Sequence, residues 1–173
     1  RRVVAYPGLM LRLWAFVALC ALMVSTPTVA CSPLPLVLEA LPQVSVVIQR
    51  DELTKQAVNA RLAENATARA AGFQQVCARQ IKTMAILFVF DDPFGGVFHM
   101  RNVLGPLDIL FADQAGVVLD AQTMAVYSKE NPRTVYSPAR NFYFALEIAA
   151  GRLGPRVQDL IGAHLRVKGV IPK

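Results

Sequence analysis

Residues 98–111 read FHMRNVLGPLDILF, in which Gly105 and Pro106 separate two strand-like segments, 97–101 and 107–112. Four polar or charged side chains lie among the apolar ones, namely His99, Arg101, Asn102 and Asp108. Because an unpaired charge is costly to bury, such residues need either a buried partner or a functional role. The stretch therefore predicts two neighbouring strands that carry a candidate site.

Turn-forming residues separate further strand-like segments along the chain. These segments are residues 44–48, 56–63, 84–90, 117–123, 141–149 and 164–167. Residues 113–116 predict a tight turn. A short helix is expected over 66–71, with Asn65 as its N-cap and Gly72 at its end. Pro155 suits the first position of another short helix. The pattern predicts a mainly β fold (α+β with short helices), a compact antiparallel β-barrel or sandwich with one or two peripheral short helices.

The opening stretch resembles the signature of an uncharacterised bacterial and archaeal family catalogued as domain of unknown function 192, F-W-M-K-N-T followed by P-L-D-I. Phe98, Met100 and Asn102 match this signature, whereas His99, Arg101 and Val103 stand where the family has Trp, Lys and Thr. The resemblance covers about residues 58–167 and implies a small β-barrel or sandwich with peripheral helices. It implies no particular activity.

The N-terminal 30 residues have the pattern of a secretory signal peptide. They contain no Asp or Glu, an apolar run over 13–24, and the small or β-branched residues Thr28 and Ala30 before a predicted cleavage at Cys31. Two alternatives are a lipoprotein with an acylated Cys31 and an uncleaved N-terminal anchor. All three predict export, to the periplasm or beyond the cell, of a Pro-rich tether (31–43) and a single β domain (44–173).

The net charge of the chain bears on whether it binds nucleic acid. Removing residues 1–30 takes away three Arg, so the formal charge falls from +6 to +3 (6 − 3), and the remaining basic residues are scattered singly. This distribution does not favour a nucleic-acid partner.

Cys31 and Cys77 form no C-x-x-C motif. They can pair in an oxidising compartment if Cys31 is not acylated, but we favour Cys77 as a small buried apolar residue.

The candidate binding residues are His99, Arg101, Asn102, Asp108 and Glu147. Strand alternation would direct His99 and Arg101 to the face opposite Phe98 and Met100. Arg101 is the expected partner of Asp108, with Asn102 as an amide donor. In this hypothesis Arg101 and Asn102 hold an anionic or carbonyl group of a ligand, and Asp108 orients them. Asp108 and Glu147 each have a structural alternative as well, a carboxylate in a salt bridge or one that accepts hydrogen bonds from backbone amides.

We predict an exported binding or accessory module for an unknown small molecule or envelope protein, with no cofactor and with membrane contact only through the signal peptide or a lipid anchor. One alternative is a hydrolase or metal-assisted enzyme that uses His99 and Asp108, although no nucleophile motif or paired histidine spacing is present. We assign no catalytic residue and no metal ligand. A second alternative is a structural envelope protein without a ligand.

Four aromatic residues flank the polar loop over 127–140, namely Tyr127, Tyr136, Phe142 and Tyr143. They could form a stacking surface for a sugar or peptide, but we favour an interpretation in which they lie at the edge of the core and anchor the loop.

Overall fold

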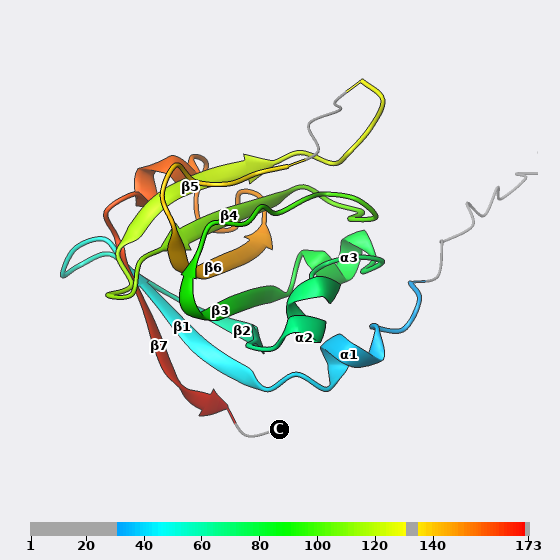
Figure 1. The fold of residues 1–173 in the computed structure, drawn as a ribbon, viewed down its shortest axis with the longest axis horizontal. Helices are drawn as coiled ribbons and strands as arrows, with labels where there is room; N and C mark the ends of the chain where they lie inside the picture. The colour runs from blue at the N-terminus through cyan, green and yellow to red at the C-terminus, as the bar shows by residue number, and fades with distance from the viewer. Residues whose placement is uncertain (1–30, 131–134, 172–173) are drawn as a thin grey trace, which may run out of the picture. The chain divides into compact units, whose positions relative to one another are not determined.

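The computed structural model describes residues 31–130 and 135–171, so the predicted signal segment 1–30 lies outside it. The described residues form one seven-stranded sheet in the order β5-β4-β6-β3-β2-β1-β7 (Figure 1). The strands are β1 (Gln43–Gln49), β2 (Lys55–Ala63), β3 (Ala85–Phe94), β4 (Leu107–Ala112), β5 (Val118–Met124), β6 (Phe142–Ala149) and β7 (His164–Ile171). Neighbouring strands are antiparallel except β2 and β3, which are parallel. The predicted mainly β fold is confirmed.

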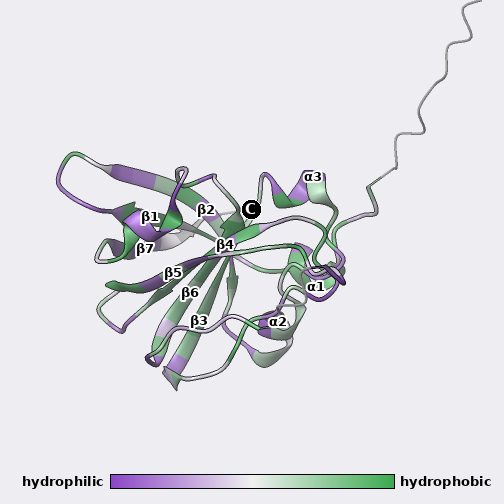
Figure 2. Ribbon diagram, turned by 90° about the horizontal axis from the view of Figure 1, so that it is seen from above, coloured by the Kyte–Doolittle hydropathy of each residue, from purple (hydrophilic) through white to green (hydrophobic). Residues whose placement is uncertain are grey.

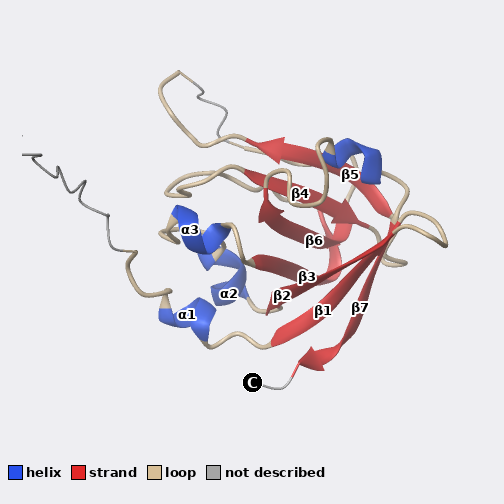
Figure 3. Cartoon of the chain, turned by 180° about the vertical axis from the view of Figure 1, so that it is seen from behind, coloured by secondary structure: helices blue, strands red, loops and turns tan. Residues whose placement is uncertain are grey.

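Short helices cover one face of this curled sheet. They are α1 (Leu36–Glu39), α2 (Ala66–Ala71) and α3 (Ala78–Ile81), and a 3-10 helix, η1 (Val157–Leu160), follows β6. Figures 1 and 3 show α1, α2 and α3 grouped together beside the strands. No helix in the described part of the chain is long and apolar enough to cross a membrane.

Helix α2 begins and ends as its sequence predicts. The Asn65 side chain accepts a hydrogen bond from the Ala68 amide at 2.9 Å, which satisfies one of the free donors of the first turn. Gly72 closes the helix with φ +46°, a conformation that a side chain disfavours. The helix therefore ends abruptly and lets the chain turn toward the sheet.

Two elements of the structure differ from those that the sequence predicts. Residues 97–101 do not form a strand, because Phe98 makes only an isolated bridge with Tyr136 and the chain then turns at Asn102, whose φ is +58°. Strand β3 continues four residues past its expected end at Phe90, where the Phe90 and Phe94 rings stack and Phe94 pairs with Phe142. Apolar alternation therefore indicates which side chains are buried in these segments, but not whether the backbone belongs to the sheet.

The predicted Pro-rich tether contains α1 and is attached to the domain. Leu38 is fully buried, and Arg61 Nη1 donates hydrogen bonds to the carbonyl groups of Leu38 (2.6 Å) and Glu39 (3.2 Å). Cys31 forms a disulfide with Cys77, with 5.7 Å between their Cα atoms. The favoured interpretation of Cys77 as an unpaired core residue is therefore wrong. A disulfide-bonded Cys31 has no thiol to acylate, so this bond and a lipid anchor at Cys31 exclude each other.

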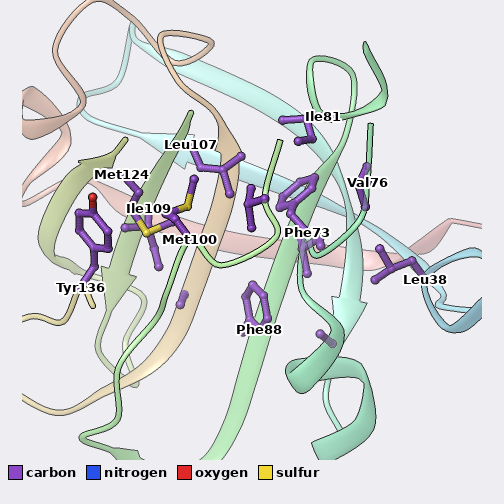
Figure 4. Close-up of a cluster of buried hydrophobic side chains, with 14 of the residues drawn as sticks. Leu38, Phe73, Val76, Ile81, Phe88, Met100, Leu107, Ile109, Met124 and Tyr136 are labelled. Carbon is purple, nitrogen blue, oxygen red and sulfur yellow. The ribbon is translucent and has the colours of Figure 1, made fainter. Parts of the chain in front are cut away.

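Both faces of the sheet are buried at its central strands β3, β4 and β6, where adjacent residues point to opposite faces and both are inaccessible to solvent. On the face beneath the helices, which we call the helix face, Phe88 and Ile109 pack with Phe73 and Met100 (Figure 4). The opposite face buries Leu87, Leu110 and Ile148, among others, against η1. Figure 2 shows the corresponding hydrophobic segments of β3, β4 and β6. A shift of one residue along a strand thus changes the side chain's surroundings completely.

Candidate functional site

A pocket of about 400 Å³ opens on the helix face between α2, β3 and the segment 97–103. This volume lies within the usual range for sites that bind small molecules. Within the described residues its aromatic lining consists of Phe73, Phe88, Phe90, Phe94 and Phe98. Its polar or charged lining consists of Arg69, Gln74, His99 and Glu147. We call it the Glu147 pocket.

The phenylalanines of the pocket support one another. The rings of Phe90 and Phe94 stack with 4.2 Å between their centres, and Phe88 meets Phe98 edge to face at 5.1 Å. Behind them, the buried Phe142 contacts both Phe90 and Phe94 edge to face. Such pairs add about 0.5–1.5 kcal/mol beyond the area they bury, so the walls are held in place without a ligand.

Glu147 is a buried carboxyl group in the wall of this pocket. Its neighbours across the sheet are Ile86 on β3 and Ile109 on β4, both fully buried. Its own exposed fraction is only 4%, and the described residues contain no hydrogen-bond donor or cation paired with it. Burial raises the pKa of Glu147 to about 8, because the charged form loses its hydration without gaining a partner. This shift favours the neutral acid over the carboxylate at pH 7.

Gly72 brings the end of α2 close to this carboxyl group. A Cβ atom at residue 72 would lie 3.9 Å from Oε2 of Glu147 and 3.9 Å from the ring of Phe88. The glycine is required by its positive φ rather than by a clash, because these distances are ordinary contacts. The cap of α2 thus forms part of the pocket wall beside the acid.

Arg69 is held at the rim of the pocket by other groups. Its Nη1 donates hydrogen bonds to the carbonyl groups of Glu64 (2.7 Å) and Val89 (2.9 Å). Its guanidinium carbon lies 5.0 Å from the centre of the Phe90 ring. Within the described chain, Arg69 forms no ion pair with Glu147. The fixed guanidinium shows that a face of this aromatic wall already accepts a cation.

The structure brings together two of the five predicted binding residues. His99 and Glu147 line the same pocket. Arg101 and Asn102 are exposed and do not line it; the carbonyl group of Asn102 accepts a hydrogen bond from the Gln75 amide at 2.8 Å. The turn at Asn102 directs these two residues away from the pocket.

Asp108 lies on the other face of the sheet from Glu147. Strands β4 and β6 pair Ile109 with Glu147 and Asp108 with Ile148, so the two acids point in opposite directions. Oδ1 of Asp108 accepts a hydrogen bond from the Thr123 hydroxyl and Oδ2 accepts one from the Gly151 amide, each at 2.7 Å. The expected pair with Arg101 is not formed, because Arg101 is exposed and no ion pair joins them in the described chain. Asp108 instead fixes β5 and the turn after β6.

We expect Asp108→Ala to destabilise the fold by about 3 kcal/mol, because two hydrogen bonds to a charged acceptor are lost, one from the Thr123 hydroxyl and one from the Gly151 amide, at roughly 1.5 kcal/mol each. Asp108→Asn should cost about 1 kcal/mol, since its amide can still accept from Gly151 and donate to the Thr123 hydroxyl. Urea unfolding at pH 7 measures both. Equal stability of the wild type and Asp108→Ala would contradict the anchoring role.

Other predicted arrangements do not form. The hydrolase alternative needs His99 beside Asp108, but His99 lines a pocket on the helix face and Asp108 lies on the opposite face. Among the described residues, no group of three or more His, Cys, Asp or Glu side chains lies close enough to hold a metal ion. Tyr136 and Phe142 are buried in the core, so the four aromatic residues near the long loop do not form a stacking surface.

Sequence reasoning missed the contribution of α2 and β3 to the pocket. Phe88 and Phe90 alternate along β3, which indicates that they share a face, but the sequence does not indicate that this face borders a pocket. From the sequence, Arg69 and Gly72 are only parts of a short helix and its cap. Their role depends on α2 packing over β3, which no local pattern contains.

Known proteins confirm the fold of this chain and assign it to a family. A Sinorhizobium meliloti protein, provisionally described as a transcription regulator, superposes with a TM-score of 0.60 at 20% identity, over 73% of this chain and 95% of that one. A protein of unknown function from Novosphingobium aromaticivorans superposes with a TM-score of 0.59 at 23% identity, over 82% and 94%.

At these identities the two structures support the fold alone. No curated protein matches the chain. The model of the family DUF192, described as "Uncharacterized ACR", matches residues 46–157, which confirms the resemblance of the opening motif. Because that match covers well over half of the chain, including the opening motif and strands β2 to β6, this chain belongs to the DUF192 family.

Proposed function

We propose that this protein is an exported binding module of the cell envelope that holds a small, largely apolar molecule in the Glu147 pocket. One observation carries the proposal: a pocket walled by phenylalanines contains a buried carboxyl group that no described protein group satisfies. Buried polar groups in folded proteins nearly always have a partner. A ligand would supply the missing one.

A purely structural role accounts less well for Glu147. Its neighbours in the sheet are apolar, and an apolar side chain at this position would avoid the cost of burying an acid. Asp108 shows how this fold uses a structural carboxylate, with both oxygens hydrogen-bonded to the protein. Glu147 has no such bonds within the described residues.

Two further features support export and binding rather than a hydrolytic reaction. The Cys31–Cys77 disulfide suits an oxidising compartment, which agrees with the signal pattern of residues 1–30. The described lining of the pocket contains no Ser, Thr, Cys or Lys that could act as a nucleophile beside His99.

A fluorescent apolar probe tests whether the pocket binds. We expect neutral N-phenyl-1-naphthylamine to bind saturably and Ala70→Trp to weaken it by roughly tenfold, because Ala70 lines the pocket and the indole would occupy it. Thr67→Trp is the matched control, since Thr67 is exposed on the same helix but does not line the pocket. Absence of saturable binding, or equal binding by both variants, would contradict the proposal.

A further inference from the structure

The aromatic walls explain why the pocket would bind an apolar body, but they do not explain the acid. Glu147 lies among Ile86, Ile109 and the phenylalanines, where an ionised carboxylate has little contact with water and no paired cation in the described chain. An acid in this position requires a partner that comes from outside the chain.

We propose that the ligand is a small molecule with a primary ammonium group on an apolar body, and that Glu147 is the counter-ion of this group. The inference rests on the proposed binding function of the pocket and specifies its ligand. The apolar body would lie against the phenylalanines, and the ammonium group would reach the carboxylate beside Gly72, where the absence of a side chain leaves space.

Two properties of the pocket favour a cation. A carboxylate and an ammonium group form a charge-assisted hydrogen bond, which is about twice as strong as a neutral one. The faces of aromatic rings also attract cations, and Arg69 over Phe90 already makes such a contact at the rim. A neutral acceptor would gain only one ordinary hydrogen bond from the protonated acid. An anion would have to lie beside a group that becomes negative as the pH rises.

The other charged and titratable groups near Glu147 leave this site open to a cation. Arg69 on α2 points its Nη1 at the carbonyl groups of Glu64 and Val89. His99, on the segment 97–103, is the other titratable lining residue in the described chain. The facing positions of β3 and β4 are Ile86 and Ile109, which carry no charge.

Binding of an ammonium group would release a proton. With a pKa of about 8, Glu147 is mostly protonated at pH 7 before a cation binds, so it must lose its proton to buffer when it pairs with the cation, while the ammonium group keeps its own. The affinity for an amine should therefore rise with pH up to about 8, where the free carboxyl group ionises. Between pH 6 and pH 8 the ionised fraction of the free carboxyl group rises from about 1% to about 50%, so we expect a gain in affinity of roughly 50-fold.

Calorimetric titration of the protein with three matched probes tests this inference. 2-Phenylethylamine carries the cation, 2-phenylethanol is its neutral counterpart and phenylacetate is an anionic one. At pH 8 we expect the amine to bind roughly tenfold more tightly than the alcohol, and phenylacetate to bind least. Titrations at pH 7 in phosphate and Tris, whose ionisation enthalpies differ, should show release of about 0.9 proton per amine, and about half a proton at pH 8.

Three variants test whether Glu147 is the group that pairs with the ammonium ion and releases the proton. Glu147→Gln should abolish the preference for the amine and the proton release, while binding of the alcohol persists. Asp108→Asn changes the buried acid on the opposite face and should keep both, and His99→Asn should keep the pH dependence. Equal affinities for amine and alcohol in the wild type, or an amine preference that survives Glu147→Gln, would overturn the inference. If 2-phenylethanol and N-phenyl-1-naphthylamine still bind in that case, the proposed function stands, and if no probe binds, both fail.

Discussion

Glu147→Gln is expected to make the protein more stable than the wild type at pH 8.5 and about equally stable at pH 4.5. The pKa of Glu147 is raised from 4.5 to about 8 in the folded protein because burial removes the hydration of its charged form. Between these pH values the unfolded chain releases a proton that the folded chain keeps. The wild type therefore loses stability as the pH rises through this window, whereas glutamine carries no proton to lose.

The expected gain in stability follows from the size of the pKa shift of Glu147. About 3.5 pH units at 1.36 kcal/mol each give an upper bound of about 5 kcal/mol. The pocket is partly open, and water can enter when the acid ionises, so we expect about 2–4 kcal/mol. For a domain of this size that is a large part of the total stability.

Urea unfolding at pH 4.5, 6, 7 and 8.5 measures the prediction, with the free energy of unfolding compared at each pH. Glu64→Gln is the matched control, because Glu64 is an exposed acid next to α2 and its removal should leave the pH profile unchanged. Parallel profiles for the wild type and Glu147→Gln would show that the buried carboxyl group is not the source of the pH dependence.

Much of the fold could be predicted because its strands carry strong local signals. The predicted bounds of β4, 107–112, agree with the structure, and the turn after it has Gly116 at φ +81°, as its chemistry requires. The helix over 66–71 was predicted with its caps, Asn65 and Gly72. In each case the deciding residues lie within a few positions of the element they define.

The candidate site was harder to predict because Asp108 and Glu147 look alike in the sequence. Each is an acid within an apolar strand. What separates them is the register between β4 and β6, which directs one to the helix face and the other away from it. Their partners, Thr123 and Gly151 for Asp108, come from chain segments that no local pattern connects. Pairing between distant strands therefore determines which of the two acids can meet a ligand.

Loss of the Cys31–Cys77 disulfide is the second change with a large expected effect. The bond joins residues 46 positions apart, and the chain-entropy estimate for a loop of this length is about 4 kcal/mol. We expect Cys77→Ala to destabilise the protein by about 2–4 kcal/mol in urea unfolding. A reductant should lower the stability of the wild type by a similar amount and leave Cys77→Ala unaffected, which serves as the control.

The loss of stability without the disulfide should be concentrated at the N-terminal side of the domain. Without the bond, α1 is held mainly by the buried Leu38 and by Arg61, whose Nη1 donates to the carbonyl groups of Leu38 and Glu39. Hydrogen exchange should therefore become faster at residues 36–41 while the central strands stay protected. If Cys31 is acylated in the cell instead, Cys77 carries a free thiol that maleimide labels without reduction. In that case the reductant would leave stability unchanged, which would contradict the disulfide in the native protein.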